Sequence, residues 1–193
     1  MESINKKDED GRTELHNAKG PISHLLDEGA DPNVQDESGW TPLMCAASSG
    51  DFDKVRTLLC SSSIDVNLRN EQGNTALHYT ASKGRNDIIT LLLQRDDVQL
   101  NLQDYNSKFT PLMRAVVANQ QVCADRLIQS GCKLNLRDCE GNTALHLAVE
   151  QNNLDIALLL LSGGAKHDIE NRFNQTPLDN ASPMMRHRLE EEL

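Results

Sequence analysis

The chain contains few aromatic residues and no long apolar run. Aromatic residues make up 3% of its 193 residues, with a single tryptophan. That is too few for the bulky core of a typical sandwich or enzyme, whereas small helical repeats pack mainly with leucine and alanine. The longest apolar stretch, IALLLL at residues 156–161, is far shorter than the roughly 20 residues that cross a bilayer. These absences favour a small helical protein without a membrane partner.

Signals for export, disulfide bonds and metal binding are also missing. The start, MESINKKDEDGR, lacks the apolar segment of a secretory leader. The five cysteines are odd in number and form no C-x-x-C pair, which argues against a disulfide framework and a structural zinc site. We therefore expect a soluble cytoplasmic protein with reduced thiols, no metal and no cofactor. The sequence leaves entry into the nucleus open.

The formal charge of −10 is unevenly distributed. Lysine and arginine number 4 against 9 acidic residues in 1–36, 6 against 9 in 37–104, 5 against 2 in 105–138 and 4 against 9 in 139–193. Nucleic acid phosphates repel a net acidic chain, so we expect no nucleic acid partner. One basic segment inside an acidic molecule favours a protein partner that carries charges of both signs.

A threonine recurs along the whole chain inside one short phrase. The copies are RTELHNA, WTPLMCA, NTALHYT, FTPLMRA, NTALHLA and QTPLDNA, with their threonines at Thr13, Thr41, Thr75, Thr110, Thr143 and Thr176. Successive gaps are 28, 34, 35, 33 and 33 residues. A period of this length indicates a stacked array, because one unit is too small to bury its own apolar face.

The fifth copy shows the local structure that each unit predicts. Asp138–Gly141 has the composition of a turn, and Thr143 stands where a helix N-cap belongs. A second helix is expected from about Leu154, and Gly163 with Gly164 should end it. The unit is therefore turn, helix, helix and loop.

The first and last copies depart from this pattern. Only 20 residues separate Thr13 from Asn33, against 25 between Thr143 and Asp168. About five residues are thus missing near Lys19, so we expect a truncated first helix and a second helix that opens at Pro21. The final unit ends in RHRLEEEL, and we expect it to be a terminal cap without a complete second helix.

The period and the T-x-L-H-x-A phrase resemble ankyrin repeats from Asp8 onward. The resemblance implies an all-α, monomeric solenoid of about six stacked helix-turn-helix units with projecting hairpin fingers and a concave face. The predicted units of this single domain, 1–193, are 8–36, 37–70, 71–104, 105–138, 139–171 and 172–193.

Four phrases resemble one ankyrin family more closely, the gankyrin family of proteasome assembly chaperones. They are DESGWTPLMCAASSG from Asp36, ALHYTASKGRNDI from Ala76, LRDCEGNTALHLA from Leu136 and IENRFNQTPL from Ile169. The family implies a non-catalytic scaffold that assembles the proteasome regulatory particle. Its partner would be the C-terminal domain of one AAA ATPase of the proteasome base, bound along the concave face.

Seven residues are candidates for binding that partner. Five match the family's contact positions, with Glu37 in place of an aspartate, and two come from the basic fourth unit. They are Asp10, Arg12, Glu37, Trp40 and Lys83, then Lys108 and Arg114. Trp40 has two interpretations, packing against the neighbouring finger or anchoring the interface, where tryptophan is enriched.

His16, His78 and His146 recur at one register of the repeat. We interpret them as structural, each hydrogen-bonding its own finger and helix, because a catalytic or metal-binding triad would not follow the repeat. No nucleophile–base pair or phosphate loop is present, so we do not expect an enzyme. The alternative function is an ankyrin-type inhibitor of a protein kinase or a transcription factor, in which an early helix can also be altered.

Overall fold

The computed structural model describes residues 4–193, and its regular structure over that range is entirely helical, without a strand. The all-α prediction is confirmed. No helix in the described range is both long and apolar enough to cross a bilayer. The chain divides into two compact units, which are described separately. The first unit is Met1–Thr80 with Arg85–Gln99, and the second is Ala81–Gly84 with Leu100–Leu193.

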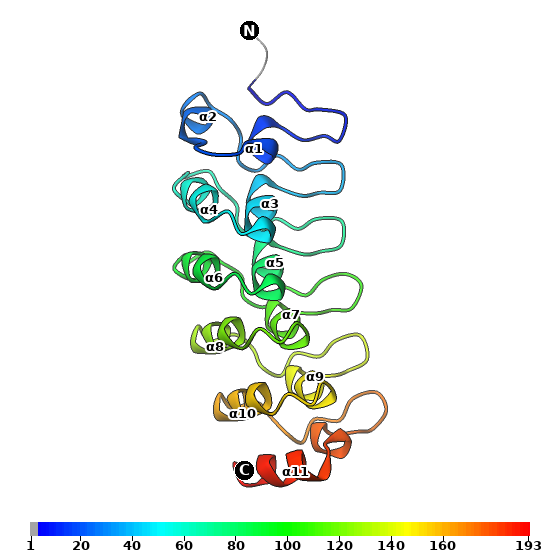
Figure 1. Ribbon diagram of the computed structural model, residues 1–193. Coiled ribbons are helices and arrows are strands. Elements are labelled where there is room, and N and C mark those ends of the chain that lie inside the picture. The colour runs from blue at the N-terminus through cyan, green and yellow to red at the C-terminus, as the bar shows by residue number, and fades with distance from the viewer. Residues whose placement is uncertain (1–3) are drawn as a thin grey trace. The chain divides into compact units, whose positions relative to one another are not determined.

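The first unit contains three helix pairs. Figure 1 shows the first helix of each pair in one row, beside the projecting loops, and the second helix in another row, farther from the loops. The helices are α1 (Glu14–Asn17), α2 (Ser23–Asp27), α3 (Pro42–Ser49), α4 (Phe52–Leu59), α5 (Ala76–Lys83, whose last three residues belong to the second unit) and α6 (Asn86–Leu93).

The second unit repeats the same arrangement (Figure 1). First helices α7 and α9 pack on each other, and α10 packs on α8 and α11. The elements are α7 (Pro111–Val117), α8 (Gln121–Gln129), α9 (Ala144–Glu150), α10 (Leu154–Ser162), the 3-10 helix η1 (Pro177–Asn180) and α11 (Pro183–Glu190). Helices this short are marginal alone, so their stability comes from stacking.

The recurring threonines cap the first helices, as the sequence predicts. The Thr41 and Thr110 hydroxyls each accept the backbone N–H three residues later at 3.2 Å. At Thr13 and Thr143 the cap is a capping box closed by the histidine three residues later. Each cap satisfies an amide that the helix itself leaves without a partner.

His16 and His146 tie a first helix to the finger of the next repeat. The Nδ1 atom of His16 accepts the Thr13 N–H at 3.0 Å, and its Nε2 donates to the Trp40 carbonyl at 3.0 Å. His146 Nε2 makes the same 3.0 Å bond to the Gln175 carbonyl. An acceptor at Nδ1 requires the neutral ring, and burial lowers the pKa of both imidazoles. The structural interpretation of these histidines is confirmed, with the bond extended to the following finger.

We predict that acid weakens the fold through these two histidines. The folded-state pKa is lowered, so below about pH 6.5 the unfolded chain binds more protons than the folded one. The free energy of unfolding therefore falls as the pH drops below 6.5 and levels off once the folded-state pKa is passed. Urea denaturation at several pH values measures this slope. The His146→Gln protein should show a smaller slope than the wild-type protein. The His187→Gln protein, changed at an exposed histidine, should show the full slope. An unchanged slope in His146→Gln would contradict the assignment.

The first repeat is shortened, as predicted, but its second helix begins later than expected. α1 has four residues and α2 five. Pro21 does not open α2, which begins at Ser23 after an N-cap at Ile22. Gly20 has a φ of +107°, which turns the chain before the proline, and the buried Ile22 fills the core there in a non-helical conformation.

The prediction that the last repeat lacks a complete second helix is wrong. Its second helix, α11, has eight residues and matches α4 in length, whereas its first helix is the single 3-10 turn η1. The charged ending obscures two apolar positions, Met185 and Leu189, which lie four residues apart and are both buried. That spacing places them on one helical face, so the helix forms and covers the preceding repeat.

Lys54 is a buried lysine that holds the shortened first repeat. Its ammonium donates to the carbonyl of His16 at 3.1 Å and to that of Ala18 at 2.9 Å. Both carbonyls lie at the end of α1, where helix carbonyls need other donors. Burial lowers the pKa of this amine. Lys54 therefore provides the C-terminal cap of α1.

We expect Lys54→Met to loosen the first repeat selectively. The two carbonyls would lose their charged donor, which costs about 1–3 kcal/mol in local opening free energy. Hydrogen exchange should therefore become faster in α1 and α2 and stay unchanged in α9 and α10. Lys133→Met, at an exposed lysine, is the matched control and should leave every helix protected as before. Equal protection of α1 in the wild-type and Lys54→Met proteins would rule out the capping role.

Candidate protein-binding face

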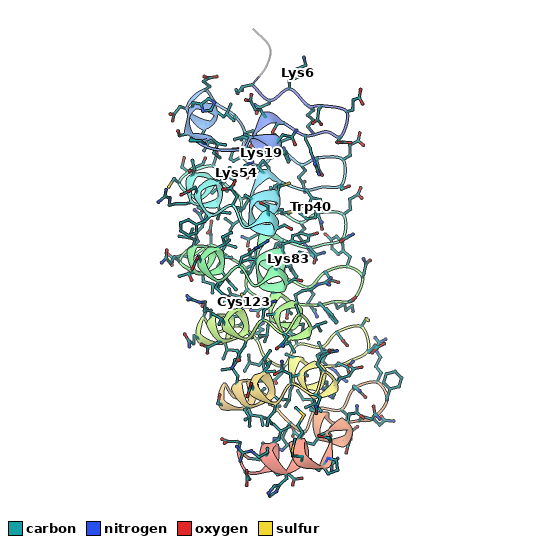
Figure 2. The ribbon with its side chains drawn as sticks, in the orientation of Figure 1. Lys6, Lys19, Trp40, Lys54, Lys83 and Cys123 are labelled. Atoms are coloured by element: carbon teal, nitrogen blue, oxygen red, sulfur yellow. The ribbon has the colours of Figure 1, made fainter. Side chains whose placement is uncertain are left out.

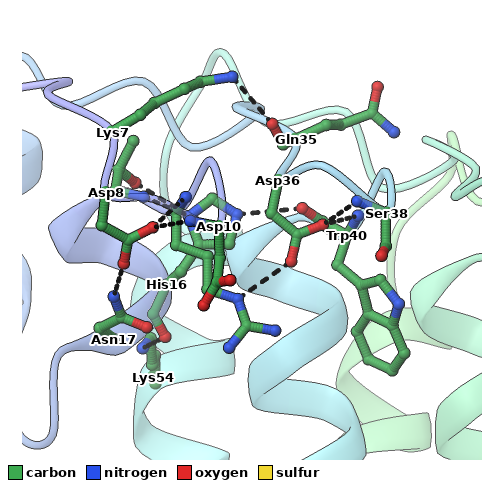
Figure 3. Close-up of polar contacts among 12 residues, drawn as sticks. Lys7, Asp8, Asp10, His16, Asn17, Gln35, Asp36, Ser38, Trp40 and Lys54 are labelled. Carbon is green, nitrogen blue, oxygen red and sulfur yellow. Dashed lines mark hydrogen bonds and ion pairs between the residues drawn. The ribbon is translucent and has the colours of Figure 1, made fainter.

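The fingers are the loops that precede each capping threonine, and an acidic or amide side chain organises each one. In the second finger, residues 36–40, Asp36 Oδ1 accepts the N–H groups of Ser38 at 3.0 Å and Trp40 at 2.8 Å (Figure 3). Asp8 accepts two N–H groups in the same way in the first finger. These turns give the finger a defined shape before any partner binds.

Neighbouring fingers are joined by backbone hydrogen bonds. In the first unit, Glu37 N–H donates to the Asp10 carbonyl at 3.0 Å, and Glu71 N–H donates to the Ser38 carbonyl at 3.1 Å. Side chains at the tips are left exposed, among them Asp10 and Glu37. The fingers and the exposed sides of the first helices together form what we call the inner face of each unit.

Arg12 is already paired within the inner face of the first unit. Its Nε donates to Asp36 Oδ2 at 3.1 Å, and the Asp36 side chain is only 3% exposed. This hydrogen bond raises the pKa of the Arg12 guanidinium. The arginine is 41% exposed, so it keeps N–H groups for a partner while Asp36 orients it.

Trp40 packs against a first helix and still reaches the surface. Its ring stacks on Tyr79 of α5 with centroids 4.2 Å apart and planes inclined by 29°. The Tyr79 hydroxyl accepts from Asn70 Nδ2 at 2.8 Å, and both rings are half-buried. The two interpretations of Trp40 are therefore compatible. It packs on Tyr79 of the next first helix and offers the remaining surface as a flat aromatic contact.

Arg114 has an equivalent setting in the second unit. Its guanidinium donates to Asp104 Oδ2 at 2.8 Å and lies 5.3 Å from the Phe109 ring centroid. The Asp104 side chain is 1% exposed and that of Arg114 is 34% exposed. A buried carboxylate and an aromatic ring thus hold the arginine in one orientation on the inner face.

Lys83 and Lys108 are exposed in the second unit. Lys83 is the last residue of α5, and Figure 2 shows its position on the ribbon. Lys108 has a φ of +57°. It stands two residues before Thr110, and the residue two before the recurring threonine has a positive φ in every finger, as Gly39 has in the second at +78°. The fourth finger, residues 104–109, is one residue longer than the second. The structure gathers Asp10, Arg12, Glu37 and Trp40 on the first unit, and Lys108 and Arg114 on the second.

Three residues of this face escaped the sequence reasoning. Tyr79 supports Trp40, while Asp36 and Asp104 hold the two arginines. One signal was available, because Tyr79 and Arg114 both lie four residues after a capping threonine. The pairing of each arginine with a finger aspartate depends on the approach of neighbouring loops, which the sequence pattern alone does not give.

The described residues offer binding chemistry of a non-covalent kind. All five cysteines are free. Among residues 4–193, no three histidine, cysteine or acidic side chains gather so that they could hold a metal ion. The inner faces instead present aromatic surface and oriented charges of both signs, which suit recognition of another protein.

Repeated helix pairs, loops joined by backbone bonds and a pre-shaped inner face define a helical repeat scaffold that binds proteins. The chain belongs to the ankyrin-repeat family. A family model described as "Ankyrin repeats (3 copies)" matches residues 15–104 and 96–172.

Relatives with known names include proteins of several kinds. Neurogenic locus notch homolog protein 1 of Mus musculus is 31% identical over 179 residues, which are 90% of this chain and 6% of that protein. NF-kappa-B inhibitor alpha of Sus scrofa is 44% identical over 63 residues, 32% of this chain and 20% of the relative. The chain thus spans a small part of these relatives.

A solved structure shows the same fold. The ankyrin repeat domain of Bcl-3, described as a member of the IkappaB protein family, aligns with a TM-score of 0.89 and 26% identity. The alignment covers 98% of this chain and 86% of that one. The ankyrin-repeat prediction is confirmed.

Proposed function

We propose that this scaffold is a non-catalytic chaperone of proteasome assembly that binds the C-terminal domain of one AAA ATPase of the proteasome base. The observation that carries the proposal is the inner face of the first unit. There the Trp40–Tyr79 stack lies in the same unit as the acidic fingertips Asp10 and Glu37, in a chain that contains the GWTP and HYTASK phrases.

The proposed mechanism is steric and electrostatic. Asp10 and Glu37 would meet basic residues of the ATPase domain, while Lys83 and Arg114 would meet acidic ones. Such complementary charges orient a partner and exclude wrong ones more than they add affinity. The bound scaffold would cover the ATPase domain and delay its docking to the core particle.

Affinity capture from cell extract tests the proposal. The wild-type protein should retain base ATPases, and Glu37→Lys should retain less of them. Lys133→Glu changes an exposed charge of the second unit and serves as the control. Capture of no base ATPase by the wild-type protein would refute the proposal.

A second candidate function is regulation of a transcription factor. The similarity to NF-kappa-B inhibitor alpha and to the Bcl-3 ankyrin domain favours it. The same capture experiment separates the two, because a transcription factor in place of base ATPases would support the second candidate. Capture of a protein kinase would instead support a role as a kinase inhibitor.

A further inference from the structure

A hollow opens beside the shortened first repeat. It has a volume of about 440 Å³ and lies between the end of α1 and the C-terminal half of α3, with Lys54 of α4 on its wall. The residues that matter for its chemistry are His16, Lys19, Cys45, Ser49, Asp51 and Lys54. The hollow lies where about five residues of a complete repeat are missing near Lys19.

The lysine on the wall of the hollow occupies an apolar position of the repeat. Lys54 is the third residue of α4, and the third residues of α6, α8 and α10 are Ile88, Cys123 and Ile156. All three are buried core residues. A charged residue stands at this register next to the truncated helix, so the missing turn and the buried cation occur together.

The charge of the hollow is positive. Lys54 uses two of its three N–H groups on the carbonyls of His16 and Ala18. Lys19 is exposed at the rim, and Figure 2 shows Lys19 and Lys54 in this part of the first unit. The carboxylate of Asp51 is engaged as the N-cap of α4, where it accepts the backbone N–H of Lys54 at 3.0 Å. Two cations thus face one anion that already has a partner.

The hollow is also connected to the inner face. Cys45 and Ser49 of the first helix α3 line it, with Cys45 half-buried and Ser49 exposed. Burial is the main cause of the raised pKa of Cys45, so this thiol is a neutral part of the wall at pH 7. A protein bound on the inner face of the first unit could therefore extend a side chain into the hollow.

We propose that this hollow receives an acidic side chain of the protein partner, a glutamate or aspartate, which takes the place of the missing helical turn. The ammonium of Lys19 pairs with the carboxylate, and the third N–H of Lys54 is available to it. The proposal deepens the proposed function by adding a contact that a repeat with complete helices lacks. The binding partner used in the tests is the domain that the wild-type protein retains in the affinity capture. The proposed function predicts an ATPase C-terminal domain, and the second candidate function predicts a transcription-factor domain.

Charge reversal at the rim is the first test. Lys19→Glu should raise the dissociation constant for that domain by about 10-fold at low salt. Lys133→Glu makes the same charge change at an exposed site of the second unit and should change it less than about 2-fold. A Lys19→Glu protein that binds as tightly as wild type overturns the inference.

Filling the hollow is the second test. Inserting VEQNN, the sequence of residues 149–153, after Ala18 restores the 25-residue spacing of a complete repeat and lets α1 extend into the space. The variant should lose about 10-fold or more in affinity. Wild-type affinity in a folded insertion variant overturns the inference, whatever Lys19→Glu does. Should the insertion variant fail to fold, Lys19→Glu decides alone. If wild type binds neither domain, the proposed function fails together with this inference.

Discussion

Trp40→Ala is expected to weaken binding of the ATPase C-terminal domain by roughly 30-fold or more, because a truncated aromatic anchor at the centre of an interface commonly costs about 2 kcal/mol or more. Trp40 is the sole tryptophan, and its ring is oriented by the stack on Tyr79 before a partner arrives. Little ordering entropy remains to be lost on binding. Isothermal titration with the purified domain measures the change.

Two controls separate contact from folding. Trp40→Phe keeps an aromatic ring over Tyr79 and should lose less affinity than the alanine variant. Phe52→Ala removes an aromatic ring that is 38% exposed on the second helix α4, outside the inner face, and should leave the affinity unchanged. The interface role of Trp40 would be wrong if Trp40→Ala bound like the wild-type protein while remaining folded at the assay temperature.

Gly39→Ala is expected to lower the free energy of unfolding by about 3 kcal/mol or more. Gly39 has a φ of +78°, and a Cβ atom there would lie 2.9 Å from Asn70 Cα and 3.0 Å from Glu71 N. Both are backbone atoms of the next finger, so relief requires the two fingers to separate. That movement would break the bond between Glu71 N–H and the Ser38 carbonyl.

Gly29→Ala is the matched control for this change. Gly29 has a φ of +91°, but nothing lies within 4 Å of its added Cβ atom. The control isolates the cost of a left-handed alanine, about 1–2 kcal/mol. Chemical denaturation of both variants gives the comparison. Equal losses in the two proteins would show that finger contact does not constrain Gly39.

The recurring phrase was sufficient to predict most of the architecture. Thr143 caps α9 and Leu154 opens α10 as expected, because capping and apolar spacing are local properties. Prediction failed at the two ends of the repeat series. Pro21 precedes α2 because a neighbouring glycine turns the chain, and α11 forms because Met185 and Leu189 pack on another repeat. Those outcomes depend on tertiary contacts.

For the candidate face, the sequence indicated exposed residues but not their partners. The exposure of Glu37, Lys83 and Lys108 follows from the repeat register. The pairing of Arg114 with Asp104 depends on how the longer fourth finger folds against α7. Lys54 went unnoticed, because a lysine in an amphipathic helix ordinarily lies in solvent, and its two acceptors are carbonyls at the end of the shortened α1.

The most direct measurement is a titration of purified C-terminal domains of the base ATPases with wild-type, Glu37→Lys and Lys83→Glu proteins at low and high salt. The proposed function predicts saturable one-to-one binding of one domain by the wild-type protein. Each charge reversal should weaken that binding at low salt, and the difference should shrink as salt screens the charges. Absence of binding to every domain, or affinities that neither reversal changes at low salt, would contradict it.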